Sequence, residues 1–314
     1  MVYVGNMNIN RETLQIFDLI FKSLMHLSSK AVINCINGLF STAYPADSSV
    51  EYPITETIED NLEKIVSDMV LIVNKRDSFH IEVQITNDAT IALRMFRYGF
   101  AEARRTQLIA PDEHLITLKF PEARIIYWES TKNTPDTVTL RLVFPGEKYF
   151  DYEVKTFKFL DHSIDDLEHR NMVLLLPFYV LKVRSALRKA HTVEERRELS
   201  DEMQHILNSV FDVIERSRAN NVLDDKDMIM ILEHMGNLFH QLYDGYEEFK
   251  EPRMTLEEKV KPKWQEYLQE GIRAGRLETQ LETARNALHA GLTVEVVRTI
   301  TGLDLETIQS IKES

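Results

Sequence analysis

The chain has 314 residues, and its 50 Asp and Glu outnumber its 37 Lys and Arg, which gives a formal net charge of −13. Non-specific affinity for DNA comes from a surplus of Lys and Arg, so this charge excludes a generic DNA coat protein and leaves a local basic surface as the route to nucleic acid. The single cysteine, Cys35, excludes an internal disulfide and a zinc site built from thiolates, and we therefore expect a cytoplasmic protein.

Residues 11–28 are predicted to form an amphipathic helix, because apolar residues recur in them at helical spacing. These residues are Leu14, Phe17, Ile20, Phe21, Leu24 and Leu27. Asp18 and Lys22 lie four residues apart on one side of this helix and can face the same neighbour. A loop rich in Pro, Ser and Asp is predicted over residues 39–53.

The run "SDMVLIVNKRDSFHIEVQ" predicts a β-hairpin. Its strands are expected at residues 68–74 and 78–85, and the three-residue loop 75–77 has an ordinary length for a hairpin. In this register Val70 lies opposite Glu82. Because side chains alternate along a strand, one face of the hairpin is wholly apolar and belongs to the core.

The other face of the predicted hairpin is acidic. It carries Asp68, Val70, Ile72, His80, Glu82 and Gln84. Asp68 and Glu82 are expected as diagonal neighbours, with α-carbons roughly 7 to 8 Å apart, so both carboxylates can converge on one Mg²⁺ ion. Two carboxylates in a partly dry cleft are costly to ionise without such an ion. The simpler alternative is a turn Asp and a solvent-facing Glu, and the pattern leaves both interpretations open.

A second helix is predicted from about Asp88, a good N-cap residue, through residue 107. It carries Arg94, Arg97, Arg104 and Arg105. These side chains either follow a DNA backbone or form a solvated helical face. Similarly, Lys22 either touches a phosphate or pairs with Asp18, and His80 either assists proton transfer or packs over a neighbour.

From Glu113 to Phe159 the pattern changes to short β-rich runs separated by Pro, Gly and Asn. Residues 1–161 therefore predict an α/β domain with a mixed sheet flanked by helices. Residues 162–250 predict a helical bundle, because apolar residues follow helical stripes. The apolar run from Met172 is far shorter than the roughly 20 residues needed to span a bilayer, so we expect a core helix and no membrane partner.

Residues 251–314 are predicted as a separate tail. Pro252 and Pro262 indicate a linker, and a highly charged helix that supports self-association follows it. Short helices broken at Gly291 and Gly302 then give the outline of a helix-turn-helix that contacts DNA or another chain. We therefore expect a homo-oligomer formed through this C-terminal helical region.

Several motifs, in this order along the chain, resemble the Rpn family of recombination-promoting nucleases, also described as transposase-like, within the PD-(D/E)XK nuclease superfamily. They are "DLIFKSLM", "SDMVLIV", "HIEVQ", "RMFRYGFAEA", "LLLPFYVLKVRSAL" and "EGIRAGRLETQLETARNALHAGLTVEVVRTITGL". The resemblance implies a restriction-endonuclease-like core that cuts DNA with Mg²⁺, for which Mn²⁺ can substitute, in recombination or transposition.

The resemblance also implies roles for particular residues. An Asp and a Glu on the two hairpin strands hold the metal in this superfamily, and they match Asp68 and Glu82. Asp18 matches an acid on the first helix, and the main-chain carbonyl of Val83 matches a further ligand. Gln84 stands where the superfamily usually has a lysine beside the attacking water, although the Rpn group often has Glu-x-Gln. Glutamine orients a water by hydrogen bonds but adds no positive charge.

Two hypotheses follow from these observations. The first is a Mg²⁺-dependent DNA endonuclease with Asp68, Glu82, Gln84 and Asp18 in its active site, and with DNA contacts from Lys22 and the helix arginines. The second is a weak or inactive nuclease-fold scaffold that acts as a binding or oligomerisation protein. The overall acidity and the missing lysine motivate the second hypothesis.

Overall fold

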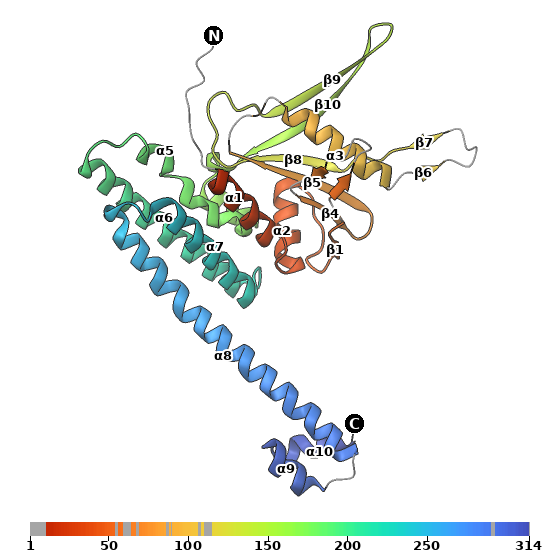
Figure 1. Ribbon diagram of the computed structural model, residues 1–314, viewed down its shortest axis with the longest axis vertical. Helices are drawn as coiled ribbons and strands as arrows, with labels where there is room; N and C mark the ends of the chain where they lie inside the picture. Colours follow the sequence, from red (N-terminus) through yellow and green to blue (C-terminus); the bar gives the residue numbers. More distant parts are fainter. Residues whose placement is uncertain are drawn as a thin grey trace. The chain divides into compact units, whose positions relative to one another are not determined.

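We analysed a computed structural model, which describes residues 11–53, 56–58, 64–66, 69–85, 88, 90–105, 108–109, 115–289 and 293–313 (Figure 1). The chain divides into two compact units, Met1–Glu257 and Glu258–Ser314. The residues predicted as a nuclease-like domain and those predicted as a helical bundle lie together in the first unit. Among the described residues, no helix has both the length and the apolar character needed to cross a bilayer.

The first predicted helix is observed as α1 (Arg11–Leu24). A further helix, α2 (Ser29–Phe40), was not predicted, and it takes in residues 39–40 of the predicted loop. The predicted helix to residue 28 is therefore too long, because the Ser28 side chain accepts a hydrogen bond from the Ala31 backbone N–H and caps α2. Both helices bury apolar side chains, and α2 holds Cys35, which is 1% exposed. Burial raises the pKa of the Cys35 thiol to about 12.

A six-stranded mixed sheet forms the centre of the first unit and confirms the predicted α/β class. Its strands, in spatial order, are β1 (Val50–Glu51), β4 (Met69–Val73), β5 (Asp77–Gln84), β8 (Glu122–Tyr127), β10 (Lys148–Lys158) and β9 (Thr137–Phe144). β8 runs parallel to both β5 and β10, and the other neighbours are antiparallel. Two small ribbons pair β2 (Glu56–Ile58) with β3 (Lys64–Val66) and β6 (Leu108–Ile109) with β7 (Ile116–Thr117).

The β4–β5 hairpin has a different register from the predicted one. Val70 pairs with His80 instead of Glu82, and the turn begins at Asn74. Asn74 and Lys75 have φ values of 52° and 56°, a left-handed conformation that asparagine tolerates and that matches the twist of a hairpin. The change amounts to two residues, so every side chain keeps the face that was predicted for it.

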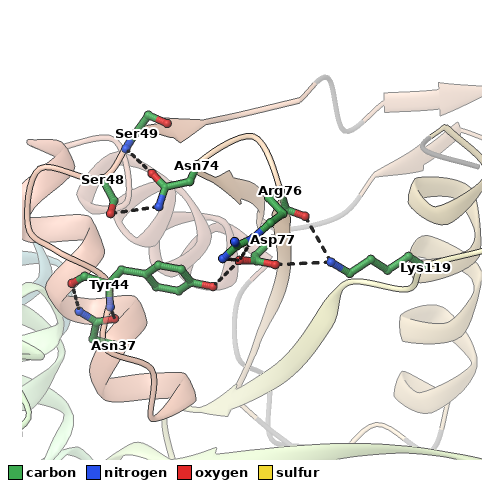
Figure 2. Close-up of polar contacts among 8 residues, drawn as sticks. All are labelled: Asn37, Tyr44, Ser48, Ser49, Asn74, Arg76, Asp77 and Lys119. Carbon is green, nitrogen blue, oxygen red and sulfur yellow. Dashed lines mark hydrogen bonds and ion pairs between the residues drawn. The ribbon is translucent and has the colours of Figure 1, made fainter.

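Polar contacts fix this turn against the preceding loop (Figure 2). The Asn74 side-chain oxygen accepts from the Ser49 backbone N–H at 3.2 Å, and its amide donates to Ser48 Oγ at 3.3 Å. On the strand side of the turn, Asp77 accepts a hydrogen bond from the Tyr44 hydroxyl at 2.9 Å. Asp77, which was predicted to lie in the loop, is the first residue of β5. The loop of the hairpin therefore lies one residue closer to the N-terminus than predicted.

Helices cover both faces of the sheet. The helix α3 (Ile91–Arg105) covers one face, where Ile91 and Met95 pack against Ile125 and Tyr127 of β8. It begins three residues after the predicted cap, Asp88. On the opposite face, Phe40 of α2 contacts Phe79 of β5 with ring centroids 4.7 Å apart.

The rest of the first unit is helical, as predicted. Its elements are η1 (Phe159–Asp161), α4 (Ile164–His169), η2 (Val173–Leu181), α5 (Arg184–Leu187), α6 (Val193–Ala219), α7 (Asp225–Tyr243) and η3 (Glu247–Phe249). The predicted core helix is observed as the 3₁₀ helix η2, in which all nine residues are buried. Pro177 lies in its middle, where the proline ring disfavours an α-helix.

One buried carboxylate joins two helix starts in the first unit. Asp227, 1% exposed, accepts hydrogen bonds from the Ser28 backbone N–H at 2.9 Å and the Ser28 hydroxyl at 2.5 Å. It also accepts from the backbone N–H of Asp224, the N-cap residue of α7. The starts of α2 and α7 therefore share one anion.

The tail consists of α8 (Lys250–His289), α9 (Val294–Thr301) and α10 (Leu305–Glu313). The predicted linker is wrong, because the residues around Pro252 and Pro262 belong to α8. Pro252 lies in the first helical turn, where a missing N–H costs little. As predicted, α9 ends at Gly302, whose φ is 71°, whereas Gly291 lies outside the described residues. The core of the second unit, Glu258–Ser314, includes Ala284, Val297, Leu303 and Ile308.

Gly38→Ala is expected to lower the free energy of unfolding by about 1 to 3 kcal/mol, the usual cost of overpacking. A Cβ at Gly38 would overlap the Met172 side chain and would lie 2.5 Å from the Arg170 carbonyl oxygen. Gly236→Ala in α7 is the matched control, because a Cβ there meets nothing within 4 Å and alanine favours a helix by up to about 1 kcal/mol. Urea unfolding followed by circular dichroism measures both, and a Gly38 variant as stable as the native chain would contradict the packing.

Candidate functional site

The predicted active-site residues lie on different elements. Glu82, Val83 and Gln84 are consecutive residues of β5, and Asp18 lies on α1. Asp68, the other carboxylate of the predicted pair, lies outside the described residues. The structure therefore gives the geometry around Glu82, and the pairing with Asp68 stays a prediction.

The Glu82 carboxylate is buried between the sheet and α3. Glu82 is 3% exposed, and the β5–β8 register places it beside Ile125, on the face that α3 covers. Its Oε1 lies 3.1 Å from a terminal nitrogen of Arg94. An ionised carboxylate at this depth is costly unless it is paired, and the Arg94 guanidinium supplies the positive charge.

Arg94 contacts a second carboxylate as well. The same guanidinium nitrogen lies 3.6 Å from Asp88 Oδ2, so Arg94 bridges the acids at the end of β5 and before α3. Burial acts to raise the pKa of Asp88, but hydrogen bonds from Thr90 and the charge of Arg94 outweigh it and lower that pKa overall. Arg94 therefore lies between two carboxylates, whose negative charges favour a cation at this position.

His80 lies next to Glu82 on the same face. Its side chain is fully buried, its Nε2 lies 3.7 Å from Glu82 Oε2, and the Tyr98 ring meets it edge-on at 5.7 Å. Within the described part of the chain, neither ring nitrogen has a hydrogen-bond partner. Both interpretations of His80 therefore have a structural basis, because it packs against Tyr98 and also faces the carboxylate.

Gln84 lies at the carboxyl end of β5 and is half-buried. In the parallel register it pairs with Tyr127, and its backbone carbonyl accepts a hydrogen bond from the Trp128 N–H at 2.9 Å. Val83 pairs with Ile126 in the same ladder. Alternation along the strand places the side chains of Gln84 and Glu82 on one face.

Asp18 and Lys22 form an ion pair on α1, with 2.8 Å between Lys22 Nζ and Asp18 Oδ2. This contact is the simpler alternative that the sequence offered for Lys22. The other carboxylate oxygen, Asp18 Oδ1, is buried without a hydrogen-bond partner among the described residues. A metal or a water is the kind of group that satisfies such an atom.

The arginines of α3 face different surroundings. Arg104 is exposed, Arg97 is half-buried, and Arg105 pairs with Glu102 at 2.7 Å. Arg94 faces the sheet, which the sequence analysis missed. A signal for this was present, because Arg94 follows Ile91 by three residues and precedes Tyr98 by four, on the apolar stripe of the helix.

The donor atoms near Glu82 suit a hard divalent ion, since carboxylate and amide oxygens are the ligands that Mg²⁺ takes. The described residues supply one carboxylate of the predicted pair. Across the described ranges, no three His, Cys, Asp or Glu side chains group as a metal-binding set. A Mg²⁺ site here requires Asp68 in addition to Glu82, and it stays a prediction.

Comparisons of the chain with protein-family models, with curated proteins and with solved structures give no match.

Removing the Arg94 charge is expected to destabilise the fold through Glu82. Arg94→Met leaves a buried carboxylate without this partner and is expected to lower the free energy of unfolding by about 1 to 3 kcal/mol, less than for a fully buried pair because the Arg94 side chain is 36% exposed. The double variant with Glu82→Gln should recover most of this loss.

A double-mutant cycle in urea measures this coupling. The exposed pair of Lys75 and Glu51, 3.8 Å apart, provides the control, for which a much smaller coupling is expected. Additive effects of the Arg94 and Glu82 substitutions would contradict the pairing.

Proposed function

We propose that the chain is a Mg²⁺-dependent DNA endonuclease of the PD-(D/E)XK type, as its resemblance to the Rpn family implies. In this proposal Asp68 and Glu82 hold the ion, and Gln84 orients the attacking water. A bound divalent ion supplies the activated water and neutralises charge on the phosphate. The observation that carries the proposal is the carboxylate of Glu82, which is 3% exposed and lies on the face of β5 that also holds His80 and Gln84.

The order of the elements supports this choice of residues. Met69, the residue after Asp68 in the sequence, pairs with Ile81, the residue before Glu82. The hairpin is followed by α3 and then by β8, parallel to β5, so β5 ends beside the start of a helical crossover. A mixed sheet with helices on both faces is compatible with a restriction-endonuclease-like core, which we include in the proposal.

Arg94 has a defined role in this proposal. Without an ion, its guanidinium pairs with Glu82 at 3.1 Å and lies 3.6 Å from Asp88, so one positive charge faces two carboxylates. A divalent ion at Glu82 competes with this ion pair, because both are attracted to the same carboxylate. The side chain is 36% exposed, so the released guanidinium can reach solvent and form a charge-assisted hydrogen bond to a DNA phosphate.

The second candidate is a binding or assembly protein that keeps the sheet as a scaffold. The ion pair between Arg94 and Glu82 favours it, because the carboxylate already has a positive partner. The uncharged side chain of Gln84 also favours the scaffold, because the superfamily usually has a lysine at this position. Metal binding separates the two candidates.

Incubation of the purified chain with supercoiled plasmid and Mg²⁺ tests the catalytic proposal. Asp68→Asn and Glu82→Gln should each lower the cleavage rate by on the order of 100-fold or more, the loss typical of one group that stabilises transition-state charge. Glu122→Gln on β8 is the control, because it makes the same change at an exposed position of the same sheet. Cleavage that persists in both acid variants would exclude the proposed site.

Thermal unfolding with increasing Mn²⁺ or Mg²⁺ tests the competition with Arg94. A ligand that binds the native state raises the melting temperature, and Arg94→Met should show a shift of the same size as the native chain at about a tenfold lower metal concentration. Glu82→Gln should abolish the shift. If the ions shift neither the native chain nor the Arg94 variant, the scaffold candidate replaces the nuclease.

A further inference from the structure

The far end of the β9–β10 hairpin exposes large apolar side chains. Val143 is 72% exposed, Phe144 52%, Tyr149 61% and Phe150 58%. Toward the other end of β10 the apolar side chains become buried, and Val154 there is 1% exposed. Figure 1 shows β9 and β10 extending beyond the helices that cover the sheet. We name the four exposed residues the hairpin tip.

The hairpin tip is apolar on both faces. The antiparallel register pairs Val143 with Tyr149 and Leu142 with Phe150, and consecutive pairs point to opposite faces of a ribbon. Contiguous exposed apolar surface of this kind marks an interaction site. Its turn is tight, with φ values of 80° at Gly146 and 59° at Glu147.

The hairpin is pre-ordered below the tip. Arg141 of β9 donates two hydrogen bonds of 2.7 Å to Asp151 of β10, and its guanidinium lies 4.3 Å from the centroid of the Tyr149 ring. The Arg141 hydrogen bonds lower the pKa of Asp151. An ordered arm loses little conformational freedom when it docks, which favours binding.

β9 also leaves a sheet edge open. Among the described strands it hydrogen-bonds to β10 alone, and its eight residues span roughly 27 Å at about 3.4 Å per residue. Proteins usually protect such edges with inward charges or proline. Within β9 the single charge is Arg141, which is turned to Asp151, and Pro145 comes after the strand.

We propose that the hairpin tip and the β9 edge form a homodimer interface, in which β9 pairs antiparallel with β9 of a second copy. Antiparallel pairing of identical strands is self-complementary, as a two-fold interface requires. Charge favours a second copy at this place. The chain carries a net charge of −13, whereas residues 137–158 hold four basic and three acidic residues, so two copies meet here without strong repulsion.

Charge disfavours DNA as the occupant. Phosphate binding needs surplus basic residues. The hairpin has nearly balanced charge, and Arg141 is paired with Asp151. This proposal does not depend on the nuclease activity, and it assigns self-association to a surface other than the C-terminal tail.

Light scattering of the full chain after size exclusion tests the interface. The native chain should have twice the monomer mass of 36.6 kDa, and the double variant Val143→Lys and Phe144→Lys should have the monomer mass. Both positions are exposed, so circular dichroism and the melting temperature should stay near the native values. Leu19→Lys on α1, at a position 63% exposed, is the control and should leave the dimer intact.

Three results would overturn the proposal. They are a monomeric native chain, a double variant that keeps the dimer mass, and a control that dissociates equally. A monomeric native chain whose affinity for duplex DNA falls in the double variant would instead assign the tip to DNA.

Discussion

The stacking of Trp128 on Phe178 joins the sheet to the helical part of the first unit. The two ring centroids lie 3.7 Å apart with an interplanar angle of 12°. Trp128 follows β8, and Phe178 lies in the buried η2 segment, which α1, α2, α4, α5, α6 and α7 all contact. Phe21 of α1 meets the same indole edge-on at 5.9 Å. Because this contact fixes β8 against η2, it also fixes β5 and the face on which Glu82 lies.

The opposite face of the sheet combines a core with an electrostatic site. Ile125 and Tyr127 of β8 pack under α3, and Glu82 lies one strand away beneath the same helix. The helix therefore supplies both the apolar cover and the positive charge of Arg94. This arrangement explains how an acid can lie in a β-strand core, because the cost of burial is offset by a partner that the same packing holds in place.

Much of the fold could be predicted from residue patterns, because they report burial directly. Met203, Ile206, Val210 and Ile214 follow the helical stripe and are buried in α6. The two faces of the β4–β5 hairpin were also correct. The predicted register of this hairpin was wrong. The register depends on the left-handed backbone of Asn74 and on the contacts of Asn74 with Ser48 and Ser49, which lie in a distant loop.

Other elements also differ from the prediction. Pro262 indicates a break from sequence alone, yet it lies inside α8. The apolar run at Pro177 indicates a buried core helix, and η2 is buried, but the proline ring disfavours its α-helical form. For the site, the sequence pattern left open whether Glu82 is buried or faces solvent, and the structure shows it buried. Its partner Arg94 was not predicted, because the strand pattern and the helix pattern were considered separately.

The carboxylate shared by two helix starts has a consequence for synthesis on the ribosome. Ser28 and Asp227 are separated by 199 positions, and the chain grows from its N-terminus. At about 5 to 20 residues per second, roughly 10 to 40 seconds pass between the appearance of Ser28 and that of Asp227. η2 is synthesised within this interval and α7 only at its end, so the apolar faces of α1 and α2 gain these two partners one after the other.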